Sequence, residues 1–580
     1  MSEEIEELSN SQKSIWLTEQ YYQDSNINNI CGTAIIKEKV DFEKLQKSIE
    51  LVCQKNDNFK LKFFIDNGIV KQTLSNQLNK IDIINVANKK ELEQIREEIV
   101  QQKFKIDNSL LYKFYIFKFS NGEGAFTLNI HHLISDAWTL AFICNEIIKT
   151  YSQLKNNKEI KEEKNYSYLD YLKTEKEYMK SEKFLKDKEY WLEKYNKIPE
   201  VAEILGSSTK KQGLIDSSAK RINIKLEKQN IEEIKSYCKT NKISLYNFFM
   251  AIYSIYIAEI TGLNEFAIGT PILNRTNYKE KNTAGMFINI APFKINYREN
   301  IKFEEYLKEV SIDSLNMLKH QKYSYQCLLE ELRQREKNIP NLYNILLSYQ
   351  ITNAQMSGED VKYNTEWTFN GNCAEDIDIQ IYDLNDTGSL NVSYDYKTSK
   401  YTEKDIKDIH KRIINIIKQV IQNNDILIKD IEIITDEEKN KIEGFNKTEL
   451  KYDKTETVVD MFEKQVKQNP NKIAIICNDT KITYEQLNEK ANILANEMQK
   501  NGVKQEDIIG LMQYRSVEMI ISILAILKCG ATYLPIDPEY PEDRISYMLE
   551  NSESKTVLVD NQTEKLIKEK VTTINVEKVD

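Results

Sequence analysis

The sequence is poor in cysteine: its 580 residues include eight, and the closest two, Cys31 and Cys53, are 53 − 31 = 22 positions apart. It contains no Cys-X-X-Cys pair and no Cys/His spacing of the kind that holds structural zinc, so we expect no metal site. Dispersed thiols favour a reducing compartment, the cytoplasm, over a disulfide framework. The first ten residues, MSEEIEELSN, lack an apolar run, so no signal peptide is expected.

Long apolar runs and an excess of basic charge are also missing. The two longest apolar stretches, LYNFFMAIYSIYIAEI and MIISILAILKCGATYLPI, contain polar residues such as Asn247, Glu259 and Lys528. They are therefore predicted to be core elements and not membrane spans. Lys and Arg number 80 against 90 Asp and Glu, a net charge of −10, and the basic residues are spread along the chain. A nucleic-acid-binding surface needs a concentrated basic face, so that function is not expected.

What the sequence does contain, 41% hydrophobic and 29% charged residues, is typical of a soluble globular protein. At 580 residues the chain is too long for one ordinary core, so several lobes are expected. Strand-like and helix-like segments alternate nearly throughout, which predicts an α/β fold. GAFTLNIHHLI predicts a strand, and the next segment, DAWTLAFICNEIIKTYSQL, predicts a helix with Asp136 as its N-cap. A second apolar helix is predicted between Ser244 as N-cap and Gly262. Residues from about 155 to 195 predict a long exposed helix that bridges two lobes. A polar stretch beginning near Thr435 predicts a linker.

Two of the four histidines stand side by side in NIHHLISDAWT, residues 129–139. Successive side chains of a strand point to opposite faces, so His131 and His132 are expected on different sides. Adjacent imidazoles of this kind cannot both reach one metal ion. The residues alone leave two interpretations open: one imidazole faces a cavity while the other supports the strand end, or both are hydrogen-bonded core histidines.

NIHHLISDAWT resembles the HHxxxDG signature of the condensation domains of nonribosomal peptide synthetases, whose fold is shared with chloramphenicol acetyltransferase. Further stretches resemble motifs of that family in the same order: LSNSQKSIWLTEQ, KNDNFKLKFF, YLDYLKTEKEY, FAIGTPILNR, GMFINIAPF, KHQKYSYQCLLEELR and YNILLSYQ. Together they extend from residue 1 to about 435. Two positions depart from the family, since Asn56 stands where a histidine is expected and Ala137 where glycine is most common.

The resemblance implies two chloramphenicol-acetyltransferase-like α/β lobes in a V-shaped pseudo-dimer, with a tunnel between them. We expect an N-lobe over residues 1–180, a C-lobe over 181–435, a linker over 436–455 and a fragment of an adenylation domain over 456–580. The last assignment rests on KITYEQLNEKAN and ILKCGATYLPIDPEYPEDRI, which resemble the first two motifs of adenylation domains. Gly530 is the last glycine, so the glycine-rich phosphate loop of that family is missing. We expect a truncated, inactive α/β subdomain without an ATP site.

The resemblance also implies roles for individual residues. His132 matches the residue midway along the tunnel, where it would orient the attacking amine and accept its proton. His131 and Asp136 match the supporting positions, and Arg275 fits the arginine that pairs with the aspartate in a buried bridge. The alternative for Arg275 is a surface ion pair, which contributes less than about 1 kcal/mol. A methyl group at Ala137 would narrow the tunnel or shift the turn, but we expect activity to survive.

The implied function is amide-bond formation by an acyltransferase. The amino group of an aminoacyl thioester, held on the phosphopantetheine arm of a carrier protein, attacks an acyl donor; the chain itself is expected to bind no cofactor.

Two stretches resemble the starter type of condensation domain, which opens lipopeptide synthetases: TEQYYQDSNINNICGTAII and NRTNYKEKNTAGMFINIAPF. In that type the donor is a fatty acyl-coenzyme A or a fatty acyl group on an acyl carrier protein. A chain that begins at Met1 with this domain is expected to receive its donor from outside. The alternatives are an ordinary peptide-forming domain fed by an upstream carrier protein and a non-catalytic docking platform. The other expected partners are the remaining domains of the same synthetase.

Overall fold

The alternating segments fold into two separate units, which a computed structural model describes over residues 5–23, 25–160, 166–209, 216–339, 341–352, 356–358, 360–384, 387–568 and 570–579. The units are Met1–Gly444 and Phe445–Asp580. Their boundary falls inside the segment expected as a linker. The sequence predicts an irregular linker there, but the segment begins with helix α13 (Asp436–Asn446). Three acidic residues in the first turn of α13 suit the positive end of its helix dipole.

The first unit contains a six-stranded sheet that forms its first lobe, with the strand order β12-β13-β2-β7-β6-β5. The bounds of these strands are β2 (Asn29–Ile36), β5 (Asp82–Val86), β6 (Tyr112–Phe119), β7 (Gly124–His131), β12 (Met356–Gly358) and β13 (Val361–Thr368). Helices α2 (Phe42–Lys55) and α4 (Ala137–Lys155) cover one face, and α3 (Lys89–Val100) covers the other. All eight residues of β7 are buried, which agrees with a central strand covered on both faces.

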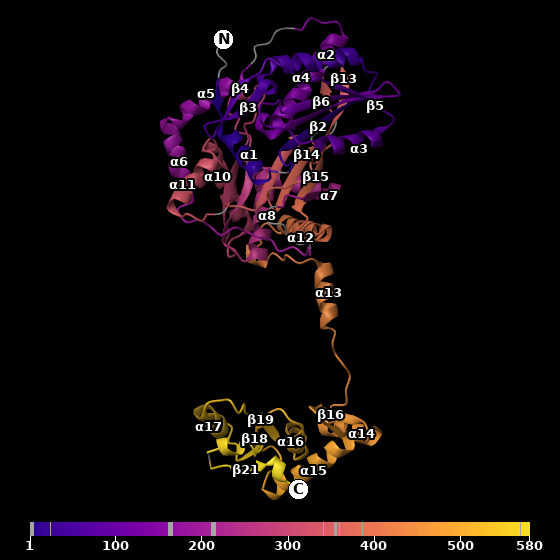
Figure 1. Ribbon diagram of the computed structural model, residues 1–580, viewed down its shortest axis with the longest axis vertical. Coiled ribbons are helices and arrows are strands. Elements are labelled where there is room, and N and C mark those ends of the chain that lie inside the picture. The colour runs from indigo at the N-terminus through magenta and orange to yellow at the C-terminus, as the bar shows by residue number, and fades with distance from the viewer. Residues whose placement is uncertain are drawn as a thin grey trace. The chain divides into compact units, whose positions relative to one another are not determined.

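Strands β12 and β13 come from the second half of the sequence but belong to the first lobe. β13 pairs with β2 in antiparallel register, from Tyr363 opposite Ile36 to Thr368 opposite Cys31. Figure 1 shows β13, in the colour of the later chain, among the indigo strands of this lobe. The expected division at residue 180 is therefore wrong for β12 and β13, because β13 pairs with β2 and β12 pairs with β13, which places both strands in the other lobe.

The second lobe contains another six-stranded sheet, with the order β10-β9-β11-β14-β15-β8. Its strands are β8 (Ala219–Lys225), β9 (Glu265–Ile272), β10 (Asn289–Asn296), β11 (Ile345–Thr352), β14 (Ile377–Leu384) and β15 (Ser389–Lys397). Its helices are α7 (Lys228–Thr240), α8 (Leu245–Thr261), α9 (Tyr278–Lys281), α10 (Phe303–Lys319), α11 (Tyr325–Arg335) and α12 (Glu403–Gln422). Helix α8 starts at its N-cap Ser244 and ends at Gly262, whose φ is +71°, as the sequence predicts.

The segment expected to be one long bridging helix is instead two short helices, α5 (Tyr168–Met179) and α6 (Glu182–Lys194). Ser181 caps the start of α6, so a new helix begins immediately after α5 ends. Nor is the segment fully exposed, because Trp191 is only 2% exposed and donates from Nε1 to the carbonyl of His320 at 3.1 Å. Helix α1 (Asn10–Tyr21) and a small sheet of β1 (Glu6–Glu7), β4 (Ile69–Leu74) and β3 (Leu61–Asp66) complete the first unit.

The second unit is built on a parallel sheet in the order β19-β18-β20-β21 and a separate hairpin, β16-β17. Its elements are α14 (Val458–Gln468), β16 (Ile473–Cys477), β17 (Thr480–Thr483), α15 (Tyr484–Lys500), β18 (Ile508–Met512), α16 (Val517–Lys528), β19 (Thr532–Pro535), α17 (Glu542–Asn551), β20 (Thr556–Val559) and β21 (Thr572–Asn575). Helices α15 and α16 pack together in one apolar core with residues of β18.

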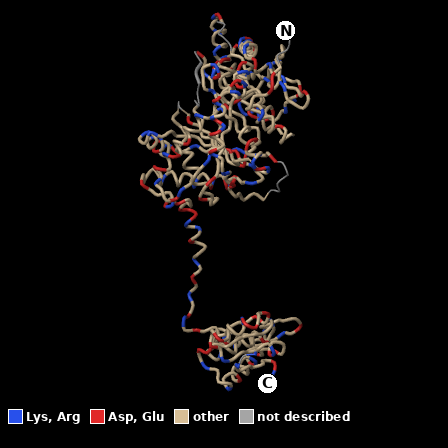
Figure 2. The backbone as a smooth tube through the Cα atoms, turned by 90° about the vertical axis from the view of Figure 1, so that its left-hand side faces the viewer, with Lys and Arg blue, Asp and Glu red and all other residues tan. Residues whose placement is uncertain are grey.

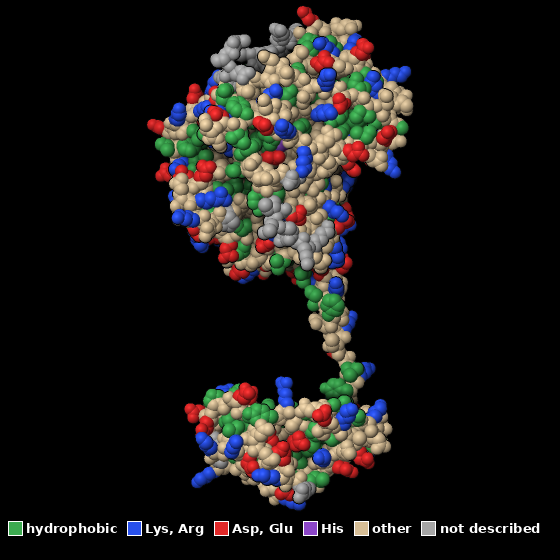
Figure 3. Space-filling model, viewed as in Figure 1, with side chains coloured by type: hydrophobic (Ala, Val, Ile, Leu, Met, Phe, Trp, Pro, Cys, Tyr) green, Lys and Arg blue, Asp and Glu red, His purple; other side chains and the backbone are tan. Residues whose placement is uncertain are grey.

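Charges of both signs are interspersed along the backbone of each unit (Figure 2) and are mixed on the face seen in Figure 3. Among the described residues, no single helix is long and apolar enough to cross a membrane; α7 and α8, which meet at 108°, reach that length and composition only as a bent pair.

Candidate functional site

The two adjacent histidines lie where β7 turns towards α4. The strand ends at His131, and His132 begins a short 3₁₀ turn, His132–Ile134, so His132 is not the strand residue that the sequence predicts. Segments that are distant in the sequence hold this turn. Gln12 of α1 donates to the carbonyl of Leu133 at 2.9 Å, and Asn58 donates to the carbonyl of Ile134 at 3.2 Å. The turn therefore has a fixed position within the first lobe.

His131 supports this turn from inside the lobe, where it is 2% exposed. Its Nδ1 accepts a hydrogen bond from the backbone N–H of Leu133 at 3.1 Å, so the ring proton lies on Nε2, which donates to Glu19 at 3.3 Å. Burial alone would raise the pKa of the Glu19 carboxyl, but its bonds to His131 and Asn28 hold the pKa below the ordinary value. Both ring nitrogens of His131 are thus occupied by structural contacts.

The ring of His132, unlike that of His131, is not held by hydrogen bonds at both nitrogens. Its backbone N–H donates to the carbonyl of Asn28 at 2.8 Å, which fixes the residue, yet its buried Nδ1 finds no hydrogen-bond partner among the described residues. Because Nδ1 is buried while the ring lines a cavity, Nε2 is the nitrogen available to that cavity. Burial lowers the pKa of His132 to about 4, although the Asp136 carboxylate opposes the shift. The imidazole is therefore a neutral base near pH 7.

Asp136 and Arg275 form the predicted buried ion pair, and both side chains are fully buried. Nη2 of Arg275 lies 3.1 Å from each carboxylate oxygen of Asp136, and Nη1 donates to the carbonyls of Glu280 and Thr283 at 2.5 and 2.6 Å. Asp136 also accepts from the backbone N–H of Thr139 at 2.7 Å, as the N-cap of α4. The pair joins α4 of the first lobe to the loop between β9 and β10 of the second, so Asp136 has a structural position.

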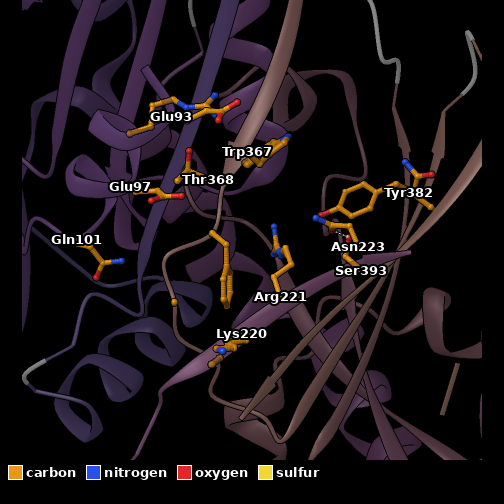
Figure 4. A pocket seen from close by; sticks show the side chains of 15 residues that line it. Glu93, Glu97, Gln101, Lys220, Arg221, Asn223, Trp367, Thr368, Tyr382 and Ser393 are labelled. Atoms are coloured by element: carbon orange, nitrogen blue, oxygen red, sulfur yellow. Dashed lines mark hydrogen bonds between the residues drawn. The ribbon is translucent and has the colours of Figure 1, made fainter. Parts of the chain in front are cut away.

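Three cavities meet at Trp367 of β13, and His132 lines one of them. The imidazole cavity, of about 240 Å³, is lined by His132, Ala137 and polar residues of the second-lobe sheet. The wide cavity, of about 890 Å³, lies between α3 and that sheet, and Figure 4 shows Glu93 and Glu97 on one side of it and Arg221 and Tyr382 on the other. The apolar cavity, of about 240 Å³, lies between the first-lobe sheet and α4. Trp367 lines all three.

Residues 2–443 match the family model described as Condensation domain. The chain belongs to this family. Residues 462–580 match a second family, AMP-binding enzyme, so the condensation domain is followed by the first part of an adenylation domain. The expected acyltransferase-type domain of a nonribosomal peptide synthetase is thus confirmed.

Curated relatives are much longer than this chain. Surfactin synthase subunit 1 and one of the plipastatin synthase subunits, both from Bacillus subtilis (strain 168), are 29% and 30% identical to it over 565 residues. These alignments cover 96% of this chain but only 16% and 22% of the two relatives. The chain therefore spans less than a quarter of their length.

Solved structures share the architecture. The four-domain nonribosomal peptide synthetase holo-AB3403, bound to AMP and glycine, has a TM-score of 0.83 at 16% identity, covering 100% of this chain and 45% of that one. A mutant starter condensation domain of rhizomide synthetase, in complex with C8-CoA and Leu-SNAC, has a TM-score of 0.65 at 18% identity, covering 74% of this chain and 98% of that one. At these identities the likeness shows the fold, and it confirms the two α/β lobes followed by an adenylation-type part.

The two departures from the family motifs have simple structural explanations in this condensation domain. Ala137 is the first residue of α4 and lines the imidazole cavity, and its φ is not positive, so the backbone does not require glycine there. Asn56 follows the last residue of α2, is 2% exposed and donates to the carbonyl of Val52 at 2.9 Å.

Sequence reasoning missed every second-lobe residue of the imidazole cavity. Arg221, Asp378 and Asp395 belong to three different strands, and no motif connects them with the histidines. One signal was available: IDIQIYDL, residues 377–384, alternates apolar and polar side chains, and period-two alternation predicts a strand with one polar face. It could not indicate what that face lies against.

Proposed function

We propose that this condensation domain joins an acyl donor to the amino group of a carrier-bound aminoacyl thioester, with His132 as the catalytic base. The observation that carries the proposal is the contrast within the histidine pair: His131 is fully hydrogen-bonded, whereas His132 presents Nε2 to a cavity. A docking platform has no need of an accessible neutral imidazole.

In the proposed reaction the amine attacks the thioester carbonyl of the donor, the C–N bond forms, and the C–S bond breaks as the tetrahedral intermediate collapses. His132 Nε2 accepts the proton that the amine loses, and that proton finally goes to the departing thiolate. An α-amino group has a pKa near 8, so about a tenth of it is already neutral at pH 7. Bringing two tethered reactants together contributes more, about 7 to 11 kcal/mol. This requires a passage open at both ends, which stays a prediction.

We further propose that the donor is a fatty acyl thioester of coenzyme A or of an acyl carrier protein. The support is the apolar cavity, which adjoins the imidazole cavity at Trp367 and is lined by Phe114, Phe126, Leu128 and five apolar residues of α4, Leu140, Ala141, Ile143, Cys144 and Ile147. Burying an acyl chain there would contribute about 0.8 kcal/mol per methylene. The rival donor is a peptidyl or aminoacyl thioester on an upstream carrier protein.

One assay tests both proposals. The chain is mixed with a carrier protein loaded with single amino acids and offered either a medium-chain acyl-CoA or a loaded donor carrier, and the product on the acceptor arm is read by mass spectrometry. We expect the N-acyl aminoacyl product from acyl-CoA. A dipeptide alone would replace the starter proposal with the rival donor. Carrier binding without either product would support the docking platform and reject His132 as a catalyst.

A further inference from the structure

The second-lobe sheet presents a polar row directly to the cavity that His132 lines. Strand β14 alternates: Ile377, Ile379 and Ile381 enter the lobe's apolar core, whereas Asp378, Gln380 and Tyr382 line the imidazole cavity. Strand register places Asp378 opposite Asp395 of β15, and Asp395 opposite Arg221 of β8. Three neighbouring strands therefore carry two carboxyl groups and one guanidinium in a single row.

That row is short of one positive charge. Arg221 binds Asp395 through two bonds, Nε to Oδ1 at 2.6 Å and Nη2 to Oδ2 at 2.7 Å, so Asp395 is fully paired. Asp378 receives only the side-chain amide of Gln380, on Oδ2 at 2.8 Å. Its Oδ1 is buried and has no hydrogen-bond partner within the described ranges. Buried carboxylates are normally paired with a cation, and no described Lys or Arg side chain forms an ion pair with Asp378.

The electrostatics of Asp378 agree with an incomplete pair. Burial first, and then the neighbouring Asp395 carboxylate, raise the pKa of Asp378 well above its ordinary range, and the opposing influence of Arg221 is weaker. A cation that entered the cavity would lower this pKa and complete the row. A divalent metal is a poor candidate, because the described residues contain no group of three or more His, Cys, Asp or Glu side chains that could hold one. A small ammonium group needs only one or two carboxylate oxygens.

We propose that Asp378 binds the amino group of the acceptor substrate and presents it to His132. The inference rests on the proposed condensation reaction, and it names the residue that recognises the acceptor. The first lobe contributes the base, and the second lobe contributes the carboxylate that holds the nucleophile, while both line one cavity of about 240 Å³. Asp378 is then a substrate-binding residue, and acceptors without an amino group do not use it.

The test uses Asp378→Asn, which keeps the shape and the bond to Gln380 but cannot become anionic. The acceptor is the carrier-bound aminoacyl thioester that the wild-type chain uses best, and its 2-hydroxy counterpart serves as a competitive inhibitor. We expect the KM for the aminoacyl acceptor to rise roughly 10- to 100-fold, the loss of one charge-assisted hydrogen bond. The inhibition constant of the 2-hydroxyacyl thioester should stay within about twofold.

Asp383→Asn is the matched control, since Asp383 lies on the same strand but on the opposite face, where it pairs with Lys235 at 2.8 Å. This variant should leave both constants unchanged, and thermal melting checks that both variants are folded. Equal weakening of the aminoacyl and hydroxyacyl ligands, or an unchanged KM for the aminoacyl acceptor, would overturn the assignment of Asp378. A wild-type chain that forms no amide at all would instead reject the proposed function.

Discussion

The two six-stranded sheets have opposite chemistry towards the cavities that meet at Trp367. The first-lobe sheet is mainly apolar at the cavity beneath α4, where Phe114, Phe126 and Leu128 line it together with the polar Thr33, Thr365 and Glu366. The second-lobe sheet is polar: its strands turn Asp378, Gln380, Asp395 and Arg221 towards the imidazole cavity and bury their alternate, apolar residues under helices. A sheet with two covered faces can supply an apolar pocket, whereas a sheet with one uncovered face can supply charge.

This difference suggests that the two lobes bind different substrates of the proposed reaction: the first lobe binds the acyl donor, and the second lobe binds the acceptor amino group. Under the proposed function, a fatty acyl chain gains free energy from leaving water, and the apolar cavity beside α4 offers it such surroundings. An amino group needs an acceptor with negative charge, and the polar face of the second lobe has one. His132 belongs to the first lobe but lines the cavity that the second lobe makes polar. The predictions below would sharpen or break this division.

The largest effect is expected from His132→Ala. Loss of the base should lower the rate of amide formation by about 10²- to 10⁴-fold, while the fold should persist because Nδ1 of the ring has no hydrogen-bond partner within the described residues. Product formation is followed by mass spectrometry. His410→Gln is the matched control, because that imidazole lies away from the cavities, in contact with Tyr394 at 2.9 Å. Wild-type turnover in His132→Ala would refute the assigned role.

Asp136→Ala should act on stability and not on chemistry. The substitution leaves the guanidinium of Arg275 buried without its carboxylate and removes the cap of α4. Breaking a buried pair in this way costs about 3 to 5 kcal/mol of the free energy of unfolding. Chemical denaturation measures the loss, with Asp136→Asn as the milder comparison. A fully stable, inactive Asp136→Ala variant would instead give this residue a direct role in catalysis.

Ala141→Phe tests whether the apolar cavity holds the donor. Ala141 is an exposed residue of α4 that lines this cavity, so a larger ring can fill the space without displacing core side chains. If the ring keeps three methylenes of the donor chain out of the cavity, the loss of binding free energy would be about 2.4 kcal/mol, which corresponds to a roughly 60-fold lower kcat/KM for a long acyl-CoA. Short acyl donors should be affected much less. Equal losses for short and long chains would place the donor outside the apolar cavity.

The pH dependence tests whether His132 is neutral. Because the folded pKa is about 4 and the ordinary value is 6.5, protonation should not limit the rate between pH 5 and 8. The logarithm of kcat/KM should rise with a slope of one until the acceptor amine titrates near pH 8. If the logarithm of kcat/KM fell more steeply than with a slope of one below pH 6.5, a second group would be titrating, which would contradict the lowered pKa of His132.

The same lowered pKa affects stability. Between about pH 6.5 and pH 4 the imidazole of His132 is protonated in the unfolded chain but neutral in the folded one, so the free energy of unfolding falls as the pH drops through this range.

Ala137→Gly should have the smallest effect. Alanine already adopts the helical backbone at the start of α4, and its methyl group occupies little of the imidazole cavity. We expect amide formation within about twofold of the wild-type rate and a small loss of stability, under about 1 kcal/mol, from the weaker helix propensity of glycine. A gain of tenfold or more would mean that the methyl group obstructs the acceptor.

Local patterns predicted the individual elements well. The cap at Asp136, the helix between Ser244 and Gly262, and the strand before the histidines depend on interactions within a few residues, and all were confirmed. The errors arose where local information ends. The strand was expected to include His132, but hydrogen bonds from Gln12 and Asn58 hold that residue in a turn.

The amino-acid sequence by itself determined the family and the residues that carry its signature, because the motifs around His132 and around Arg275 are each contiguous in the chain. Only the tertiary structure decided what surrounds the imidazole. His132 and Asp378 are 378 − 132 = 246 positions apart, and they share a cavity because β13 crosses into the first lobe and β14 turns its polar face towards it. Strand pairing between distant segments depends on the packing of the whole lobe, so no local pattern could reveal it.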